Sequence, residues 1–293
     1  MSAAAIETRG LGRRFGRVLA LEDLTLRVDE GEVFGFLGPN GAGKTTTIRC
    51  LLGLITPTSG TASILGRPAG EASVRADVGY LPGDLMLWPW YTGAQTLDFL
   101  ARLSGRAPGR RAALLDLFGF SAADLGRKVG AYSDGMKQKI GVIQAMQCEP
   151  RLILLDEPTK GLDPLVQQAF YHSLTEARAG GATIFFSSHI LPEVERVCDR
   201  VAMLRRGKLV SVGSVDEARR AQLRRVVVRF SREVAPGELS PFGRIVEHDA
   251  LRVSMLVTQA DLPALITRLA GLPIADLEAD APHLEDAFLE YYK

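Results

Sequence analysis

The chain has 293 residues, and its 35 lysines and arginines almost balance its 34 aspartates and glutamates, giving a net charge of +1. That balance argues against a nucleic-acid-binding protein, which needs concentrated positive charge to neutralise phosphates. The sequence has neither a secretory signal pattern nor the roughly 18 consecutive apolar residues of a bilayer span, so we expect the chain by itself to be cytosolic. Cys50, Cys148 and Cys198 are widely spaced, which indicates reduced structural thiols.

The first third of the chain predicts strands at residues 19–28, 32–37 and 60–65 and a helix at 45–54. Between the second strand and the helix, residues 38–45 read Gly-Pro-Asn-Gly-Ala-Gly-Lys-Thr and fit the phosphate loop G-x-x-x-x-G-K-[ST] at every fixed position. Its glycines let backbone N–H groups turn inward around a phosphate chain. Lys44 would reach the β and γ phosphates, and Thr45 would coordinate Mg²⁺. The predicted residues of this nucleoside triphosphate site are Gly38, Pro39, Asn40, Gly41, Ala42, Gly43, Lys44, Thr45 and Thr46.

Residues 93–148 have mainly helical periodicity, interrupted by a loop at 104–111 that is rich in glycine and arginine. An apolar run then leads into Asp156 and Glu157, as expected for a buried strand that delivers carboxylates to its C-terminal end. Asp156 would hold the Mg²⁺ shell opposite Thr45, and Glu157 would polarise the attacking water as general base. Taken alone, this run is also compatible with an ordinary strand end and an N-capping aspartate.

Three further motifs surround this strand: Tyr132-Ser-Asp-Gly-Met136, Gly161-Leu-Asp163-Pro, and Thr183-Ile-Phe-Phe-Ser-Ser-His189. In this order and spacing, residues 4–214 resemble the ATPase subunit of the ATP-binding cassette (ABC) family, of the multidrug and antibiotic-efflux branch. The resemblance implies an α/β fold: a P-loop NTPase (RecA-like) core with an antiparallel β subdomain and an inserted helical subdomain. It also implies ATP and Mg²⁺ as cofactors, sandwiched between two copies of the chain.

The resemblance assigns roles to individual residues. Phe15 would stack on adenine, although an isolated phenylalanine is more often a core residue. Ser133 and Gly135 would contact the γ-phosphate bound by a second subunit, Asp163 would connect the two sites, and His189 would sense the γ-phosphate. With Lys44 and Glu157, His189 completes the predicted catalytic set.

Two departures from the family pattern stand out. The usual glutamine after Gly79-Tyr-Leu-Pro82 is replaced by Gly83-Asp84, so Asp84 either supplies the missing Mg²⁺ ligand or caps the next segment. Asp134 replaces the first glycine of the signature segment and Met136 its glutamine; we expect Asp134 to point outward, because a carboxylate facing a triphosphate is unfavourable.

Composition changes after residue 213, where a charged segment occupies residues 216–225. Beyond it, the sequence predicts strands at 226–230, 244–247, 251–257 and 274–277. Helices are predicted at 259–270 and from His283 onward. We therefore predict an ATPase domain at residues 1–214 and a small accessory α+β domain at 215–293. The segment from Pro282 to Tyr291 resembles the C-terminal extension of efflux-type cassette ATPases.

The sequence thus predicts the ATPase subunit of an exporter, which lies peripherally on the cytoplasmic face of the membrane and drives a separate integral permease by ATP-dependent dimerisation. Trp88 and Trp90, flanked by Leu85, Leu87 and Tyr91, are expected to anchor that permease, with burial in the core as the alternative. An ABC importer ATPase, or an ABC ATPase that remodels nucleic acid or ribosomes, remains as a second interpretation.

Overall fold

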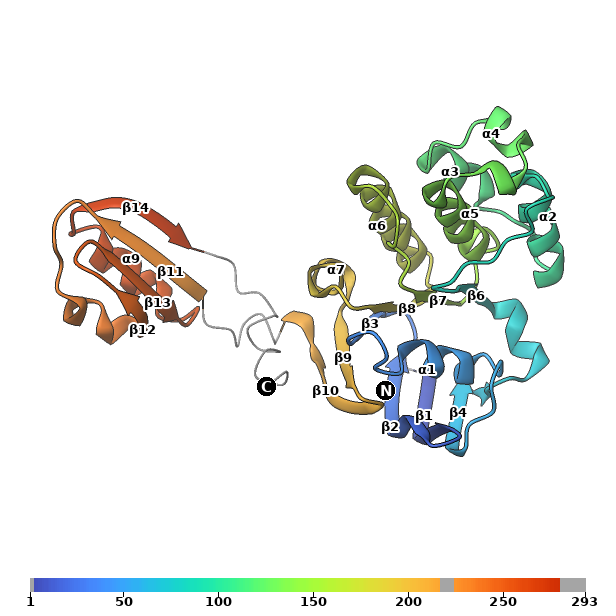
Figure 1. Cartoon of the computed structure of the whole chain (residues 1–293), viewed down its shortest axis with the longest axis horizontal. Coiled ribbons are helices and arrows are strands. Elements are labelled where there is room, and N and C mark those ends of the chain that lie inside the picture. The colour runs from blue at the N-terminus through green and yellow to red at the C-terminus, as the bar shows by residue number, and fades with distance from the viewer. Residues whose placement is uncertain (1–2, 217–223, 280–293) are drawn as a thin grey trace. The chain divides into compact units, whose positions relative to one another are not determined.

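The computed structural model describes residues 3–216 and 224–279. The chain forms two compact units, Met1–Gly213 and Ser214–Lys293, and each is described by itself (Figure 1). The charged segment expected at 216–225 and the final helix expected from His283 lie largely or wholly outside the described residues.

A six-stranded sheet forms the centre of the first unit. Its strand order is β10 (Lys208–Ser214), β9 (Arg200–Arg205), β3 (Val33–Leu37), β8 (Thr183–Ser188), β7 (Leu152–Asp156) and β6 (Val78–Leu81). The pairs from β9 through β6 are parallel, and every residue of β3, β7 and β8 is buried, as continuous apolar runs predict. Parallel strands bring the ends of β3, β7 and β8 to one edge, where the predicted motifs follow.

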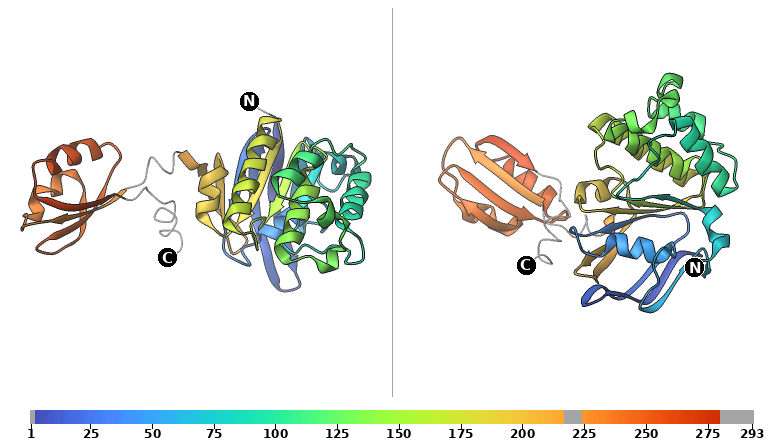
Figure 2. Two further views of the ribbon diagram at one scale, coloured as in Figure 1. Left: turned by 90° about the horizontal axis from the view of Figure 1, so that it is seen from above. Right: turned by 45° about the vertical axis from the view of Figure 1, so that its right-hand side comes forward.

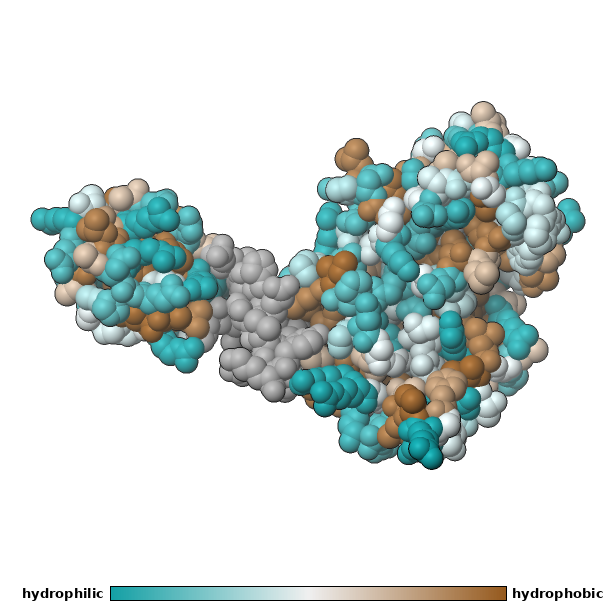
Figure 3. Space-filling view, viewed as in Figure 1, coloured by the Kyte–Doolittle hydropathy of each residue, from teal (hydrophilic) through white to brown (hydrophobic). Residues whose placement is uncertain are grey.

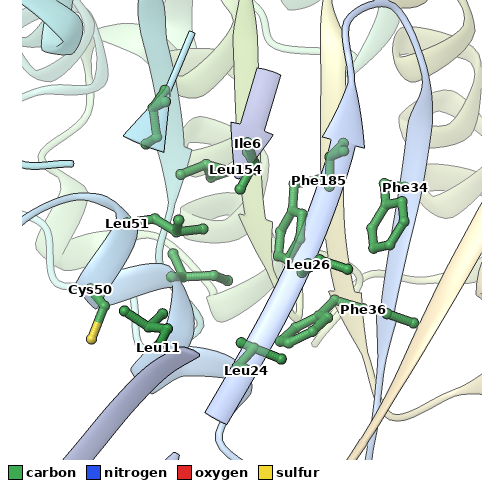
Figure 4. Packing of buried hydrophobic residues seen from close by; sticks show 14 of the residues in the cluster. Ile6, Leu11, Leu24, Leu26, Phe34, Phe36, Cys50, Leu51, Leu154 and Phe185 are labelled. Atoms are coloured by element: carbon green, nitrogen blue, oxygen red, sulfur yellow. The ribbon is translucent and has the colours of Figure 1, made fainter. Parts of the chain in front are cut away.

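A second, antiparallel sheet has the order β2 (Val18–Asp29), β1 (Ala4–Phe15), β4 (Ser59–Ile64) and β5 (Arg67–Pro68). Helix α1 (Lys44–Leu51) lies between this sheet and the central one in Figure 1. Figure 4 shows how the core joins the layers: Leu24 and Leu26 from the outer sheet face Phe34, Phe36 and Phe185 from the central sheet. The phosphate loop is therefore carried by a strand and a helix that are both anchored in one core.

The helical subdomain comprises α2 (Gly93–Ser104), α3 (Arg111–Leu117), α4 (Ala122–Gly126) and α5 (Asp134–Met146), with short 3₁₀ turns at Ala72–Asp77 and Val129–Ala131. It gathers on one side of the central sheet (Figure 2). Helix α2 begins at a capping box, in which Thr92 and Gln95 each satisfy the other's backbone N–H, and ends at Gly105 with φ of 68°. Helices α6 (Pro164–Ala179) and α7 (Leu191–Val197) follow β7 and β8.

The second unit is a four-stranded antiparallel sheet with the order β12 (Arg244–His248), β13 (Arg252–Val257), β11 (Arg224–Phe230) and β14 (Ile274–Ala279). Helix α9 (Leu262–Leu269) buries Leu265 and Leu269 in a core with Val226, Val228 and Met255. Two 3₁₀ turns, Pro236–Glu238 and Ser240–Phe242, separate β11 from β12. The strands and helix expected from the sequence in this part of the chain are confirmed, with ends shifted by a few residues.

Candidate functional site

The phosphate loop has the backbone that its glycines predict. A Cβ on Gly38 would lie 2.4 Å from the carbonyl oxygen of Leu204. Gly43 has φ of 112°, and a Cβ there would lie only 2.7 Å from Ala20 O, so neither position accepts a side chain. Lys44 is 6% exposed and donates from Nζ to Gly38 O at 2.6 Å. The ammonium group is thus held inside the loop, where a phosphate chain would lie.

Asp156 ends β7 with no exposed surface and accepts two hydrogen bonds. Thr45 Oγ1 donates to Oδ2 at 2.7 Å, and Ser187 Oγ on the neighbouring strand donates to Oδ1 at 2.6 Å. Ser187 was missed as a site residue from the sequence; its place in the Ser-Ser pair before His189, on a strand next to β7, was the available signal.

These oxygens fit Mg²⁺, which prefers hard oxygen ligands and commonly takes only one or two from protein, the rest coming from phosphates and water. In residues 3–216 and 224–279, no three His, Cys, Asp or Glu side chains gather into a site that could hold a metal ion by themselves. Burial, with the Asp156 carboxylate adding to it, raises the pKa of Tyr80 to about 12, so this neighbour stays neutral.

Glu157 lies at the centre of the predicted catalytic residues. Its Oε1 is 3.0 Å from Lys44 Nζ, and its Oε2 is 2.6 Å from His189 Nδ1. Glu157 has φ of 49°, a left-handed backbone that is strained for a residue with a side chain. His189 follows the last residue of β8 and its side chain is 47% exposed, while that of Glu157 is 19% exposed. The structure therefore brings the three predicted catalytic side chains into contact.

The two residues that replace the family glutamine lie differently from our expectation. A Cβ on Gly83 would be 3.3 Å from Asp156 Oδ2, so Gly83 is the position that faces this carboxylate. Asp84 is instead 86% exposed, and its Oδ1 is 3.7 Å from Lys160 Nζ. The structure does not bring Asp84 to the Thr45–Asp156 pair, because the Asp84 side chain points outward. No helix begins directly after Asp84, so Asp84 does not cap one either.

The signature segment begins α5. Ser133 is the N-cap, and its hydroxyl oxygen accepts from Met136 N at 3.2 Å, which leaves the hydroxyl hydrogen free to donate. Asp134 points outward as predicted, with a side chain 96% exposed and 3.2 Å from Lys137 Nζ. Gly135 lies near Gly161, since a Cβ there would be 3.3 Å from Gly161 O. Within residues 3–216 no hydrogen bond joins Ser133 or Gly135 to the phosphate loop.

The remaining predicted contacts lie on the surface. Asp163 is the N-cap of α6, and its Oδ1 accepts from Leu165 N and Val166 N at 3.0 Å. Phe15 is 44% exposed, so it is not a core residue, and the Arg13 guanidinium lies 4.4 Å from the centre of its ring. Pro39, Asn40 and Thr46 are likewise at least partly exposed in and after the phosphate loop.

Comparison with known proteins identifies the family. A family model described as ABC transporter matches residues 21–160, and one described as EvrA-like ABC transporter, C-terminal domain, matches residues 222–278. The Nod factor export ATP-binding protein I of Burkholderia orbicola is 33% identical over 99% of this chain and 97% of its own length. The chain belongs to the family of ABC transporter ATP-binding proteins.

Other relatives and solved structures match only part of this chain. An uncharacterized ABC transporter ATP-binding protein of Nostoc sp. is 45% identical over 69% of this chain, but over only 62% of that relative's own length. A solved ATP-binding subunit of an ABC transporter superposes with a TM-score of 0.68 at 34% identity, covering 74% of this chain and 92% of its own. A dimeric ATP-binding cassette in a post-hydrolysis state, bound to ADP and Pi, superposes with a TM-score of 0.65 at 21% identity. The match covers 72% of this chain and 98% of that cassette. The predicted P-loop NTPase fold is therefore confirmed.

Proposed function

We propose that this ABC protein is the ATP-hydrolysing subunit of an exporter, which energises a separate membrane permease by closing as an ATP-bound homodimer. The observation that carries the proposal is the convergence of Lys44, Glu157 and His189 beside the Thr45–Asp156 pair. The domain roles follow: residues 1–214 bind and hydrolyse ATP, and residues 215–293 form an accessory domain.

The chemistry assigns each side chain a task. Glu157 accepts the proton of the attacking water, Lys44 neutralises charge on the β and γ phosphates, and His189 holds the γ-phosphate and orients Glu157. Phe15 offers an exposed ring face to the adenine. Thr45 and Asp156 would hold Mg²⁺, which would supply positive charge beside the phosphate oxygens. Asp84 is not needed as a third protein ligand in this scheme, because Mg²⁺ usually keeps several waters in its coordination shell.

Dimerisation is proposed because two of the predicted ATP contacts, Ser133 and Gly135, make no hydrogen bond to the phosphate loop within residues 3–216 of their own chain. Ser133 and Gly135 lie at a helix N-terminus with an available hydroxyl donor, which suits an anion bound by another copy. Exposed Leu165 and Ile190, which follow Asp163 and His189, add apolar surface at the same sheet edge. ATP binding between two copies would favour the closed state, and hydrolysis would release it.

A permease partner is supported by an apolar pocket beside β6. Leu85, Leu87 and Trp88 line it together with Leu100 and Leu103 of α2. Met86 is 91% exposed at its rim and Leu103 67%, which is unusual for side chains of this size. The face of this unit in Figure 3 is mainly hydrophilic, with apolar residues gathered in separate patches.

In the described residues, no helix has the length and apolar character to cross a bilayer. We place the protein peripherally on the cytoplasmic face of the membrane.

Export, rather than import, is favoured by a relative that matches almost the whole chain and is named for Nod factor export. An importer ATPase would use the same catalytic residues, and a remodeller of nucleic acid or ribosomes would need basic surface that the net charge of +1 does not suggest.

The test is phosphate release by the full chain with Mg²⁺ and ATP, alone and with its permease in vesicles. We expect the unsubstituted chain to hydrolyse ATP, and we expect Lys44→Ala and Glu157→Gln to abolish this activity. The control is Glu22→Gln, which changes an exposed carboxylate paired with Lys208 and should leave hydrolysis unchanged. Stimulation by the reconstituted permease supports the transporter assignment. Hydrolysis stimulated by ribosomes or DNA, and not by any permease, would contradict it.

A further inference from the structure

A buried carboxylate joins the two loops that carry Glu157 and His189. Glu193 in α7 is only 6% exposed and accepts two hydrogen bonds from hydroxyl groups. Thr159 Oγ1 donates to Oε1 at 2.6 Å, and Ser188 Oγ donates to Oε2 at 2.7 Å. A carboxylate this far from water requires such partners, because an unpaired buried charge is costly. Glu193 is thereby committed to these two contacts.

The donors occupy informative positions in the sequence. Thr159 follows Glu157 by two residues and precedes Asp163 by four, and Ser188 directly precedes His189. Ser188 Oγ also accepts from Ile190 N at 2.9 Å, so one hydroxyl fixes the backbone on both sides of His189. On the other side of the Glu157 loop, Gln138 Nε2 of α5 donates to Pro158 O at 2.8 Å. The loop is therefore fastened by buried side chains from two different helices.

We propose that Glu193 is a positioning residue for ATP hydrolysis: through Thr159 and Ser188 it holds the strained Glu157 and the exposed His189 in mutual contact. This inference rests on the roles assigned above to Glu157 and His189. Glu193 itself touches neither nucleotide-binding nor reacting groups. Its loss leaves the phosphate loop intact and allows the Glu157 and His189 segments to move apart, which lowers kcat much more than it changes the KM for ATP.

The experiment uses the full chain with Mg²⁺ and ATP and three variants of the network. Thr159→Val removes one hydroxyl at nearly constant shape, and Glu193→Gln keeps the shape while replacing one acceptor with a donor. We expect each to lower kcat about tenfold, because one buried group loses its partner. Thr159→Ser, which keeps the hydroxyl, should retain the kcat of the unsubstituted chain. Thr8→Val serves as the matched control, since Thr8 is a buried threonine whose hydroxyl joins β1 to Leu24 and Leu26 of β2, far along the chain from these loops.

A double-mutant cycle separates positioning from folding. If Glu193 acts through His189, Glu193→Gln should have less than about a twofold effect on kcat in a His189→Ala background. An undiminished tenfold effect there would overturn the proposal, as would a Thr159→Val protein with normal kcat, or a KM that rises in proportion to the loss of kcat. If instead Glu157→Gln keeps full activity, the proposed catalytic base is wrong. The comparison of Thr159→Val with Thr8→Val tests only the Glu193 network, so the two failures can be told apart.

Discussion

Lys44 and Glu157 form an ion pair, with Lys44 Nζ 3.0 Å from Glu157 Oε1. One side chain is 6% exposed and the other 19%, so the attraction is only weakly screened by solvent. The group proposed to bind phosphate and the group proposed to activate water thus neutralise each other. An arriving triphosphate must compete with Glu157 for the same ammonium group.

This competition predicts opposite effects of one substitution on binding and on turnover. Glu157→Gln removes a negative charge next to the phosphate site and frees Lys44, so ATP should bind several-fold to about tenfold more tightly. Turnover should fall at least roughly a hundredfold, because the general base is lost. Equilibrium binding of a fluorescent ATP analogue and phosphate release measure the two effects. Weaker ATP binding by Glu157→Gln than by the Glu22→Gln control would contradict the competition.

Asp84 is expected to be dispensable for the metal. Its carboxylate is 86% exposed and close to Lys160, whereas Gly83 faces Asp156. Asp84→Ala should therefore leave the Mg²⁺ concentration for half-maximal hydrolysis unchanged within about twofold, while Asp156→Ala should abolish Mg²⁺-dependent hydrolysis. A Mg²⁺ titration of hydrolysis decides this. A large shift for Asp84→Ala would return Asp84 to the role of metal ligand that the sequence first suggested.

Trp88 and Trp90 are predicted to behave differently, although only Pro89 separates them in the sequence. Trp88 packs edge-on against Phe99 with ring centres 5.0 Å apart, and also contacts Tyr91 at 5.8 Å. Trp88→Ala should therefore lower the free energy of unfolding by at least about 1 kcal/mol. Trp90 is 63% exposed, so Trp90→Ala should leave the melting temperature nearly unchanged and weaken co-purification with the permease.

Thermal unfolding and pull-down of the reconstituted permease check these two substitutions, with Phe99→Leu as a control for the aromatic packing alone. Unaltered permease binding by Trp90→Ala would remove this tryptophan from the proposed interface.

The buried cysteines should be inert in the folded chain. Burial raises the pKa of the Cys50 thiol, and raises the pKa of Cys198 well above its ordinary value. Because the thiolate is the reactive form, neither should be alkylated by iodoacetamide at about pH 8 until the chain is unfolded. Mass spectrometry of the labelled peptides reports this. Rapid labelling of Cys198 in the native chain would contradict its burial against the central sheet.

Much of the site could be predicted because its signals are local. The strand, loop and helix around Gly38 to Thr45 follow from one short motif, and Asp156 and Glu157 from the apolar run before them. In the second unit, the strands predicted at residues 244–247 and 251–257 were similarly evident from alternating apolar residues.

Features that depend on contacts distant in the sequence could not be predicted. Glu193 meets Thr159 across 34 positions, and nothing near either residue in the sequence indicates the pair. Trp88 packs against Phe99 of the next helix, a contact that the residues around Trp88 in the sequence do not indicate. Asp84 was interpreted as a ligand because a sequence does not show in which direction an exposed loop side chain points.

Closure of two copies of this chain upon ATP is tested most directly by sedimentation velocity of the Glu157→Gln variant with Mg²⁺ and ATP. We predict that the variant is a monomer in the absence of nucleotide. In the presence of Mg²⁺ and ATP, we predict a dimer that holds two ATP molecules. Adding Ser133→Arg should return the protein to a monomer, because Ser133 would face the γ-phosphate bound by the other copy. A Glu157→Gln chain that binds ATP yet stays monomeric, or a dimer indifferent to Ser133→Arg, would contradict ATP-driven closure.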